Sequence, residues 1–402
     1  MVSAVAGSNP VVHPHDLNES GSISLLHSSC SWSGGDLLIQ IGMPMLIVDA
    51  HLDLSLNATV WERDLTLPAS EIRAAEQQMT DFKFRGTGTV SLAELQRGEV
   101  GLCVATLFAR CAAPDEDAGK LATYSSPEAA WDETQRQLGW YREMESRGWM
   151  VQIVDRTGLD QHVARCLNGE VGDIPIGYVL SLEGADSIVT PGHLERSYDQ
   201  GLRAIGPGHY GKGRYGGGTA DDSGLNAAGR ELLAEMERLG IILDATHLSE
   251  PSFWEALDVF GGPVWASHNN CRALVPGDRQ FSDDQLRALI SRGAVIGTAF
   301  DAWMLTPNWQ KGVSRPESSG VTLDSVADHI DHVCQVAGNA RHAAIGTDLD
   351  GGFGREQSPA DVDTIADLQR LPGILAGRGY SEADVRDIMH GNWLRFLRNA
   401  WS

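Results

Sequence analysis

The stretch that decides the fold is LIVDAHLDLS, residues 46–55. It begins with an apolar run, Leu46 to Val48, and continues into two residues that can bind metal or carry protons, His51 and Asp53. Side chains two positions apart in an extended chain point the same way, so these two are expected side by side where a buried strand ends. A capping aspartate beside an unrelated histidine is the alternative interpretation of so short a motif.

Further apolar runs rich in Val, Ile and Leu follow at residues 100–108, 177–182, 202–205, 241–245, 263–266, 294–299 and 343–347. They lack the alternation of a half-exposed strand, which is typical of parallel strands buried on both faces. Helices are predicted between them at residues 127–147, 227–239, 283–292, 325–337, 359–372 and 381–400. Eight strands alternating with helices predict an α/β fold, the (β/α)8 TIM-type barrel. A doubly wound open sheet would carry a glycine-rich phosphate loop after its first strand, where this chain has HLDLSLNATVW.

The domain organisation expected from these patterns is simple. Residues 46–402 are predicted to form a single barrel, with segment 61–98 as a helical insertion over its mouth. Residues 1–45 are predicted to be a disordered N-terminal extension, because they show neither helical nor strand periodicity. They contain no Lys or Arg, so they lack the positively charged start of a secretory signal.

The composition argues against nucleic acid and membranes as partners. The chain has 402 residues and a formal net charge of −23, and so acidic a surface repels nucleic acid and anionic membranes. No apolar stretch reaches the length of a membrane span. The six cysteines form no C-x-x-C pair, and a chain of this size needs no disulfides, so a cytoplasmic location is expected.

The ends of the predicted strands carry a set of groups that can bind metal. They are His51, Asp53, Glu183, His209, His247, His268 and Asp348. Active sites of barrels are assembled from the carboxyl ends of the strands, so these side chains are expected to converge. Several buried carboxylates in one place repel each other unless a cation lies between them. The pattern therefore predicts bound divalent cations.

The ligand types suggest how two cations would be held. Imidazoles and carboxylates without a thiolate fit zinc best, so we expect two Zn²⁺ per chain, with Mn²⁺, Fe²⁺ and Co²⁺ as alternatives. One ion would use His51, Asp53 and Glu183. The other would use Glu183, His247 and His268. Glu183 can serve both because a carboxylate has two oxygens.

Together these segments resemble a known family. The motifs that carry the resemblance are VDAHLDL, LSLEGAD, GLNAAGRELLAEMERLGIILDATHLS, ASHNNCRAL, PGDRQFSDDQL, IGTDLDGG and GNWLRFLR. In this order, over about residues 46–400, they are similar to the membrane (renal) dipeptidase family of zinc peptidases, family M19 of the amidohydrolase superfamily. The resemblance implies a barrel with a dinuclear zinc site that cleaves dipeptides, and a chain that often forms homodimers.

The resemblance also implies roles for single residues. His51 and Asp53 would bind one zinc and His247 and His268 the other, with Glu183 as the bridge. Arg279 matches the arginine that holds the carboxylate of the substrate. His209 corresponds to a substrate-contacting histidine, although the usual Thr-His-Asn surroundings are replaced here by GPGHYGKGRYGGG.

The expected reaction is hydrolysis of a dipeptide, including L-D pairs, by attack of a metal-bridging hydroxide. Asp348 would move a proton to the leaving amine, and His209 would stabilise the charge that develops on oxygen. Another small amide, such as an N-acyl amino acid or a lactam, is the first alternative substrate. A non-catalytic metal-binding barrel is the second alternative.

Overall fold

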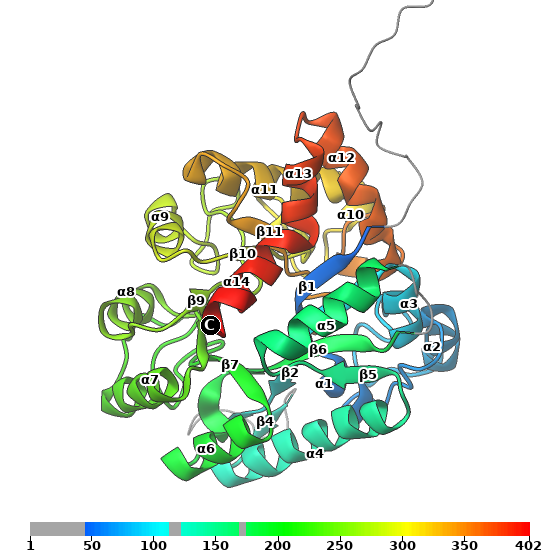
Figure 1. Ribbon diagram of the computed structural model, residues 1–402. Helices are drawn as coiled ribbons and strands as arrows, with labels where there is room; N and C mark the ends of the chain where they lie inside the picture. Colours follow the sequence, from blue (N-terminus) through cyan, green and yellow to red (C-terminus); the bar gives the residue numbers. More distant parts are fainter. Residues whose placement is uncertain (1–44, 112–121, 169–173) are drawn as a thin grey trace, which may run out of the picture. The chain divides into compact units, whose positions relative to one another are not determined.

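The computed structural model describes residues 45–111, 122–168 and 174–402 (Figure 1). The extension predicted over residues 1–45 lies outside the described residues except for Met45. The N–H of Met45 donates a hydrogen bond to Oε1 of Gln369 at 2.9 Å. Among the described residues, no helix is long and apolar enough to cross a membrane.

Eight parallel strands form the centre of the fold, and all eight predicted strands are confirmed. They are β1 (Ile47–Leu52), β2 (Val100–Phe108), β6 (Ile176–Glu183), β7 (Leu202–Gly206), β8 (Ile242–Asp244), β9 (Val264–Trp265), β10 (Ile296–Thr298) and β11 (Ala343–Ile345). The first six pair in this order, and β10 pairs with β11. A bridge between Ala266 and Ile296 joins β9 to β10. The N–H of Asp348 donates to the carbonyl of His51 at 3.3 Å and links the last strand back to the first. The fold is therefore a TIM-type (β/α)8 barrel.

Three further strands are short and were not predicted. β5 (Met150–Gln152) pairs with β6 outside the barrel order, while β3 (Arg110–Cys111) and β4 (Thr123–Tyr124) pair with each other. Runs of two or three residues are too short to give a readable hydrophobic period.

The helices surround the strands (Figure 1). They are α1 (Leu54–Thr59), α2 (Ala69–Glu76), α3 (Leu92–Arg97), α4 (Pro127–Ser146), α5 (Arg156–Leu167), α6 (Pro191–Asp199), α7 (Ala227–Leu239), α8 (Glu250–Val259), α9 (Asp283–Ser291), α10 (Pro316–Ser319), α11 (Leu323–Ala337), α12 (Leu371–Gly377), α13 (Glu382–Arg386) and α14 (Asn392–Ala400). Caps define the ends of α7: the side chain of Asn226 accepts from the N–H of Gly229, and Gly240 adopts φ 73°.

The helix predicted over 359–372 is wrong at its start. A 3-10 segment, Ile365–Arg370, begins only after Thr364 and runs into α12. Thr364 forms a capping box with Asp367, which fixes the start of the helical segment there. The helix predicted over 381–400 is interrupted by a π turn, Asp387–Gly391, between α13 and α14.

The last helix closes one end of the barrel. Trp393 and Phe396 of α14 pack with buried strand residues that include Val48, Val104 and Trp265. The indole N–H of Trp393 donates to the carbonyl of Ile345 at 2.9 Å. Figure 1 shows α14 running across the centre of the strands. Because this end is filled with apolar side chains, the polar strand ends meet at the opposite rim.

Segment 61–98 contains two of these helices, α2 and α3. Buried Arg63 at its start donates to Oε1 of Glu76 at 2.8 Å and to Oδ2 of Asp350 at 3.3 Å. Asp350 also accepts from the N–H of Thr89 at 2.8 Å. The insertion is thus attached to the loop that follows β11, at the polar end of the barrel.

Candidate metal centre

The predicted metal-binding groups lie at the carboxyl ends of five barrel strands, where these ends meet at one rim. His51 lies in β1 and Glu183 ends β6, whereas His247, His268 and Asp348 follow β8, β9 and β11. His247 and Asp348 adopt φ of 66° and 59°, a left-handed backbone that residues other than glycine rarely occupy. Such conformations persist only where the surrounding structure fixes them, and they are concentrated at functional sites.

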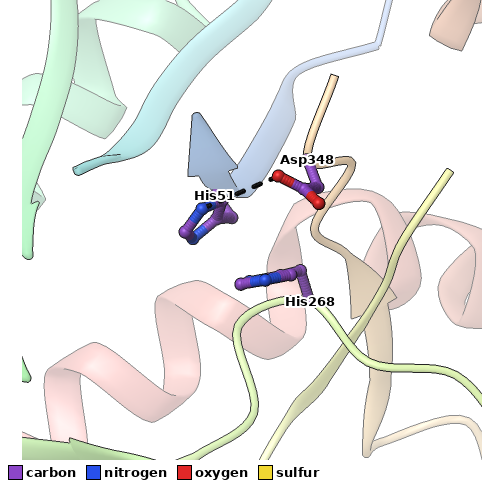
Figure 2. A group of neighbouring side chains, drawn as sticks. All are labelled: His51, His268 and Asp348. Atoms are coloured by element: carbon purple, nitrogen blue, oxygen red, sulfur yellow. Dashed lines mark ion pairs between the residues drawn. The ribbon is translucent and has the colours of Figure 1, made fainter. Parts of the chain in front are cut away.

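Glu183 lies between two groups of side chains, one at each oxygen. Its Oε1 lies 3.3 Å from Nε2 of His247 and 3.4 Å from Nε2 of His268. Its Oε2 lies 3.7 Å from Nε2 of His51. The same nitrogen of His51 is 3.7 Å from Oδ2 of Asp53 and 3.8 Å from Oδ1 of Asp348. Figure 2 shows His51 and Asp348 facing each other, with His268 beside them.

Several polar atoms of this group lack ordinary partners. Nε2 of His51 and Oδ1 of Asp53 are buried and accept or donate no hydrogen bond. Nε2 of His247 and Nε2 of His268 point at each other across 3.2 Å. Buried polar atoms are normally paired, and converging imidazole nitrogens beside carboxylate oxygens are ligands for Zn²⁺ and similar cations. The side chains present therefore fit bound divalent cations.

The other ring nitrogen of each histidine contacts a hydroxyl. Ser267 Oγ lies 2.8 Å from Nδ1 of His268, and Thr219 Oγ1 lies 3.1 Å from Nδ1 of His247. Thr106 Oγ1 lies 3.4 Å from Nδ1 of the third histidine, in β1. A hydroxyl that accepts the Nδ1 proton leaves the lone pair on Nε2, where it faces the centre. These hydroxyls were not predicted from the sequence, because their proximity to the histidines depends on strand register and on the path of the loops.

The electrostatics agree with a cation site. Burial by itself would lower the pKa of His51, but the surrounding carboxylates, Glu183 first, raise that pKa to about 10. Burial raises the pKa of Glu183 to about 7 and the pKa of Asp348 well above its usual range. Burial also holds the pKa values of His247 and His268 well below the usual imidazole value, so both rings are neutral at pH 7. A divalent cation would relieve the repulsion among these carboxylates and accept the neutral imidazoles as ligands.

A cavity of about 310 Å³ opens over the centre. Among the residues named from the sequence, it is lined by Asp53, Glu183, His209, His247, Arg279 and Asp348. His51 and His268 lie beside these at the distances given above. The structure thus brings all eight predicted site residues together, and none of them lies elsewhere.

His209 and Arg279 occupy different parts of the wall. The His209 ring lies 4.4 Å from that of His247 between ring centres, and its Nδ1 is buried without a partner. Arg279 is 3% exposed, and it donates to Oδ1 of Asn269 at 2.8 Å and to the carbonyl of His268 at 3.0 Å. Those bonds use two of the five N–H groups of a guanidinium, so the side chain is fixed and still has donors for a ligand.

Asp301 also lines the cavity, although it was not predicted from the sequence. It stands at the third position beyond β10, which ends at Thr298. The apolar run predicted as this strand, residues 294–299, contains no acidic residue or histidine at its end, and Asp301 follows two positions later. The signal that identifies Asp301 is therefore an acidic residue shortly after the end of a predicted strand.

A family model and several known proteins match the sequence of this chain. The model of the membrane dipeptidase family, peptidase family M19, matches residues 39–401. An uncharacterized protein in the pqqA 5' region of Klebsiella pneumoniae is 31% identical over 60% of this chain and 86% of its own length. Dipeptidase tcpJ of Claviceps purpurea is 27% identical over 81% of this chain and 74% of its own length.

Two solved structures of metallopeptidases have a fold similar to that of this chain. Dipeptidase AC, a metallopeptidase of family M19, covers 89% of this chain and 99% of its own with a TM-score of 0.70 at 22% identity. A metallopeptidase from Rhodobacter sphaeroides, liganded with a phosphinate mimic of the dipeptide L-Ala-D-Ala, covers 89% of this chain and 100% of its own with a TM-score of 0.69 at 22% identity. Because the family model spans nearly the whole chain, this chain belongs to the membrane dipeptidase family, peptidase family M19, a family of metallo-dipeptidases.

Proposed function

We propose that residues 46–402 form a single catalytic domain that hydrolyses dipeptides at a centre of two divalent cations, with zinc as the expected metal. His51 and Asp53 would hold one cation, His247 and His268 the other, and Glu183 would bridge them. The observation that carries this proposal is the position of Glu183, whose Oε1 faces His247 and His268 while its Oε2 faces His51. A carboxylate shared in this way fits two ions better than one.

Cations held there would supply an activated water molecule and polarisation of the scissile carbonyl. The chain's own residues would position the substrate and move protons. Asp348 would take a proton at Oδ1 or Oδ2 and pass it to the leaving amine; its position in the cavity beside His51 supports this role. Arg279 would pair with the terminal carboxylate of the substrate, and His209 would donate to the oxygen on which charge develops.

The substrate class that we favour is a dipeptide with a D-residue at its carboxyl end. The Rhodobacter sphaeroides metallopeptidase that shares this fold was solved with a phosphinate mimic of L-Ala-D-Ala. The cavity of about 310 Å³ is of a size for a short substrate, and fixed Arg279 lies in its wall.

An N-acyl amino acid or a lactam is the second candidate. The observation behind it is the glycine-rich loop that carries His209, in which Tyr210 forms a bridge with Thr219 and Lys212 forms one with Gly217. This loop replaces the surroundings that the family resemblance leads us to expect, so the pocket beside His209 has its own shape.

The test is to measure metal content and activity on the same preparation. We expect about two ions per chain, loss of turnover on chelation, and faster hydrolysis of L-Ala-D-Ala than of N-acetyl-alanine. His51→Ala should abolish turnover and lower the metal content, while the matched substitution His193→Ala on α6 should change neither. Full activity in chelated protein, or in His51→Ala, would contradict the proposal.

A further inference from the structure

Asp301 is a buried acid in the wall of the substrate cavity, and among the described residues no cationic side chain forms an ion pair with it. It is 7% exposed, and its two oxygens accept from one amide, Nε2 of Gln357, at 2.8 and 3.0 Å. The N–H of Trp303 approaches Oδ1 only at 3.4 Å. Lys311 lines the same cavity, and its positive charge acts against the burial that raises the pKa of Asp301, but its Nζ lies over the Trp303 ring at 4.4 Å and makes no ion pair with the carboxylate in the described part of the chain.

Comparison with another buried acid shows how unusual this is. Asp350 is 1% exposed, and its carboxylate accepts from the N–H groups of Thr89 and Val90, from the Thr89 hydroxyl and from Arg63. A carboxylate can accept about four hydrogen bonds, and burying its charge is costly unless a cation or enough donors surround it. Asp301 therefore keeps unused acceptor capacity on the side that faces the cavity.

We propose that Asp301 binds a cationic group of the substrate. This inference rests on the proposed function, because it concerns the same cavity. Arg279 provides a fixed cation in the cavity wall, and a free dipeptide carries a carboxylate at one end and an ammonium at the other. Burial raises the pKa of Asp301 to about 7, and an ammonium beside its carboxyl group would favour the ionised form. An N-acyl amino acid lacks the ammonium. Asp301 would thus make the site select substrates that carry a cationic group near this carboxylate.

The cation could come from two parts of a substrate. The α-ammonium is present in every dipeptide, whereas a side-chain ammonium or guanidinium is present only in those that contain Lys or Arg. The chemistry at Asp301 is the same, so substrates that differ in one of these groups distinguish them.

A purely structural role for Asp301 predicts a different outcome. Its side chain caps the 3-10 turn Ala302–Met304 and holds Gln357. Asp301→Asn keeps the size and one acceptor oxygen of this side chain but removes the charge. If this variant binds substrate more weakly but keeps its thermal stability, the negative charge of Asp301 is what contributes to substrate binding.

The kinetic test compares wild type, Asp301→Asn and the charge-matched control Asp258→Asn on the exposed side of α8, all loaded with metal. For Asp301→Asn we expect KM to rise about 30-fold or more, as for loss of one partner of a buried charge pair, with a smaller change in kcat. A rise for L-Ala-D-Ala and L-Lys-D-Ala alike assigns the α-ammonium, and a rise for L-Lys-D-Ala alone assigns the side chain. A change below about 3-fold for both substrates overturns the inference.

A binding measurement keeps the inference testable if the variant folds poorly or the enzyme cleaves no dipeptide. Calorimetry on wild type would compare phosphinate mimics of L-Ala-D-Ala and L-Lys-D-Ala, each with a free and with an acetylated α-amine. We expect either the free-amine form or the lysine form to bind about 30-fold more tightly than its neutral counterpart. Equal affinity across all of them overturns the role of Asp301. Failure of metal-loaded wild type to cleave dipeptides counts only against the proposed function.

Discussion

At the scale of single residues, the proposed ligand histidines depend on hydroxyl groups that orient them. Ser267 is the closest of these, with its Oγ 2.8 Å from Nδ1 of His268, and it is fully buried. Carboxylates and backbone carbonyls are the usual hydrogen-bond partners of ligand histidines. A hydroxyl can play the same part, but it is an uncharged acceptor and orients the ring less firmly. The orientation of the imidazole should therefore be sensitive to loss of a single oxygen atom.

We predict that Ser267→Ala weakens metal binding about 10-fold or more, because the His268 ring loses the acceptor that fixes its tautomer. Competition of the protein with a chromogenic chelator measures the change. Ser291→Ala on α9 removes a hydroxyl that only bonds the carbonyl of Ala288, and it should leave the affinity unchanged. Equal affinity in both variants would show that the hydroxyl does not orient the ligand.

His329, on α11, gives a residue-scale prediction about pH. Burial lowers the pKa of His329 to about 3, and its Nδ1 accepts the N–H of Cys271 at 3.0 Å. The unfolded chain binds a proton at this residue below about pH 6.5, whereas the folded chain does not until about pH 3. Stability from this group is therefore present above pH 6.5 and is lost as pH falls toward 3.

We predict that His329→Gln reduces the loss of unfolding free energy between pH 7 and pH 4.5, because glutamine can accept the same N–H without titrating. Urea unfolding at the two pH values measures this loss in each protein. His193→Ala on α6 should retain the wild-type pH dependence. An unchanged slope in His329→Gln would exclude His329 as a source of acid sensitivity.

At the scale of elements, the strands could be predicted because burial on both faces leaves continuous apolar runs. α7 was predicted over its full length, because Asn226 and Gly240 mark its ends. The π turn Asp387–Gly391 has no sequence signal of its own, because a shift from i+4 to i+5 bonding leaves the residue types unchanged. Strand β5 was missed because its three residues give no period.

The tie between the 61–98 insertion and the β11 loop gives an element-scale prediction. Arg63 is 4% exposed and pairs with Asp350, which is 1% exposed and two residues from Asp348. We predict that Arg63→Met lowers the unfolding free energy by about 3–5 kcal/mol, because it leaves Asp350 buried without its cation. It should also lower kcat, because the loop that carries Asp348 loses an anchor.

Two unfolding experiments check the cause of that loss. Adding Asp350→Asn to Arg63→Met removes the unpaired charge, so the double variant should lose less stability than the sum of the single variants. Arg97→Met, at a side chain that is 62% exposed, should cost less than about 1 kcal/mol. A loss no larger for Arg63→Met than for Arg97→Met would contradict the proposed tie.

At the scale of the whole molecule, the sequence was enough to predict the strand ends and therefore the residues that converge. His51 and His268 are far apart in the chain, but the barrel places the ends of β1 and β9 at one rim, and their ring centres lie 3.8 Å apart. What the sequence could not provide is the arrangement within the rim. That Glu183 lies between two groups of ligands depends on the pairing of β6 with β2 and β7.

Because of the same convergence, we expect the stability of the whole barrel to depend on bound metal. Asp53, Glu183 and Asp348 are three carboxylates around His51, and a cation that binds only the folded chain stabilises it by mass action. At a free metal concentration of 1,000 times Kd, the unfolding free energy rises by about 4 kcal/mol for one site.

We predict that chelation lowers the melting temperature by at least several degrees, measured by calorimetry with metal content determined in parallel. His51→Ala serves as the comparison, because a protein that lacks this proposed ligand would keep only the second cation site and should lose less stability to the chelator than wild type does. An unchanged melting temperature in metal-free wild type would contradict the proposed centre, because it would mean that the carboxylates tolerate one another without a cation.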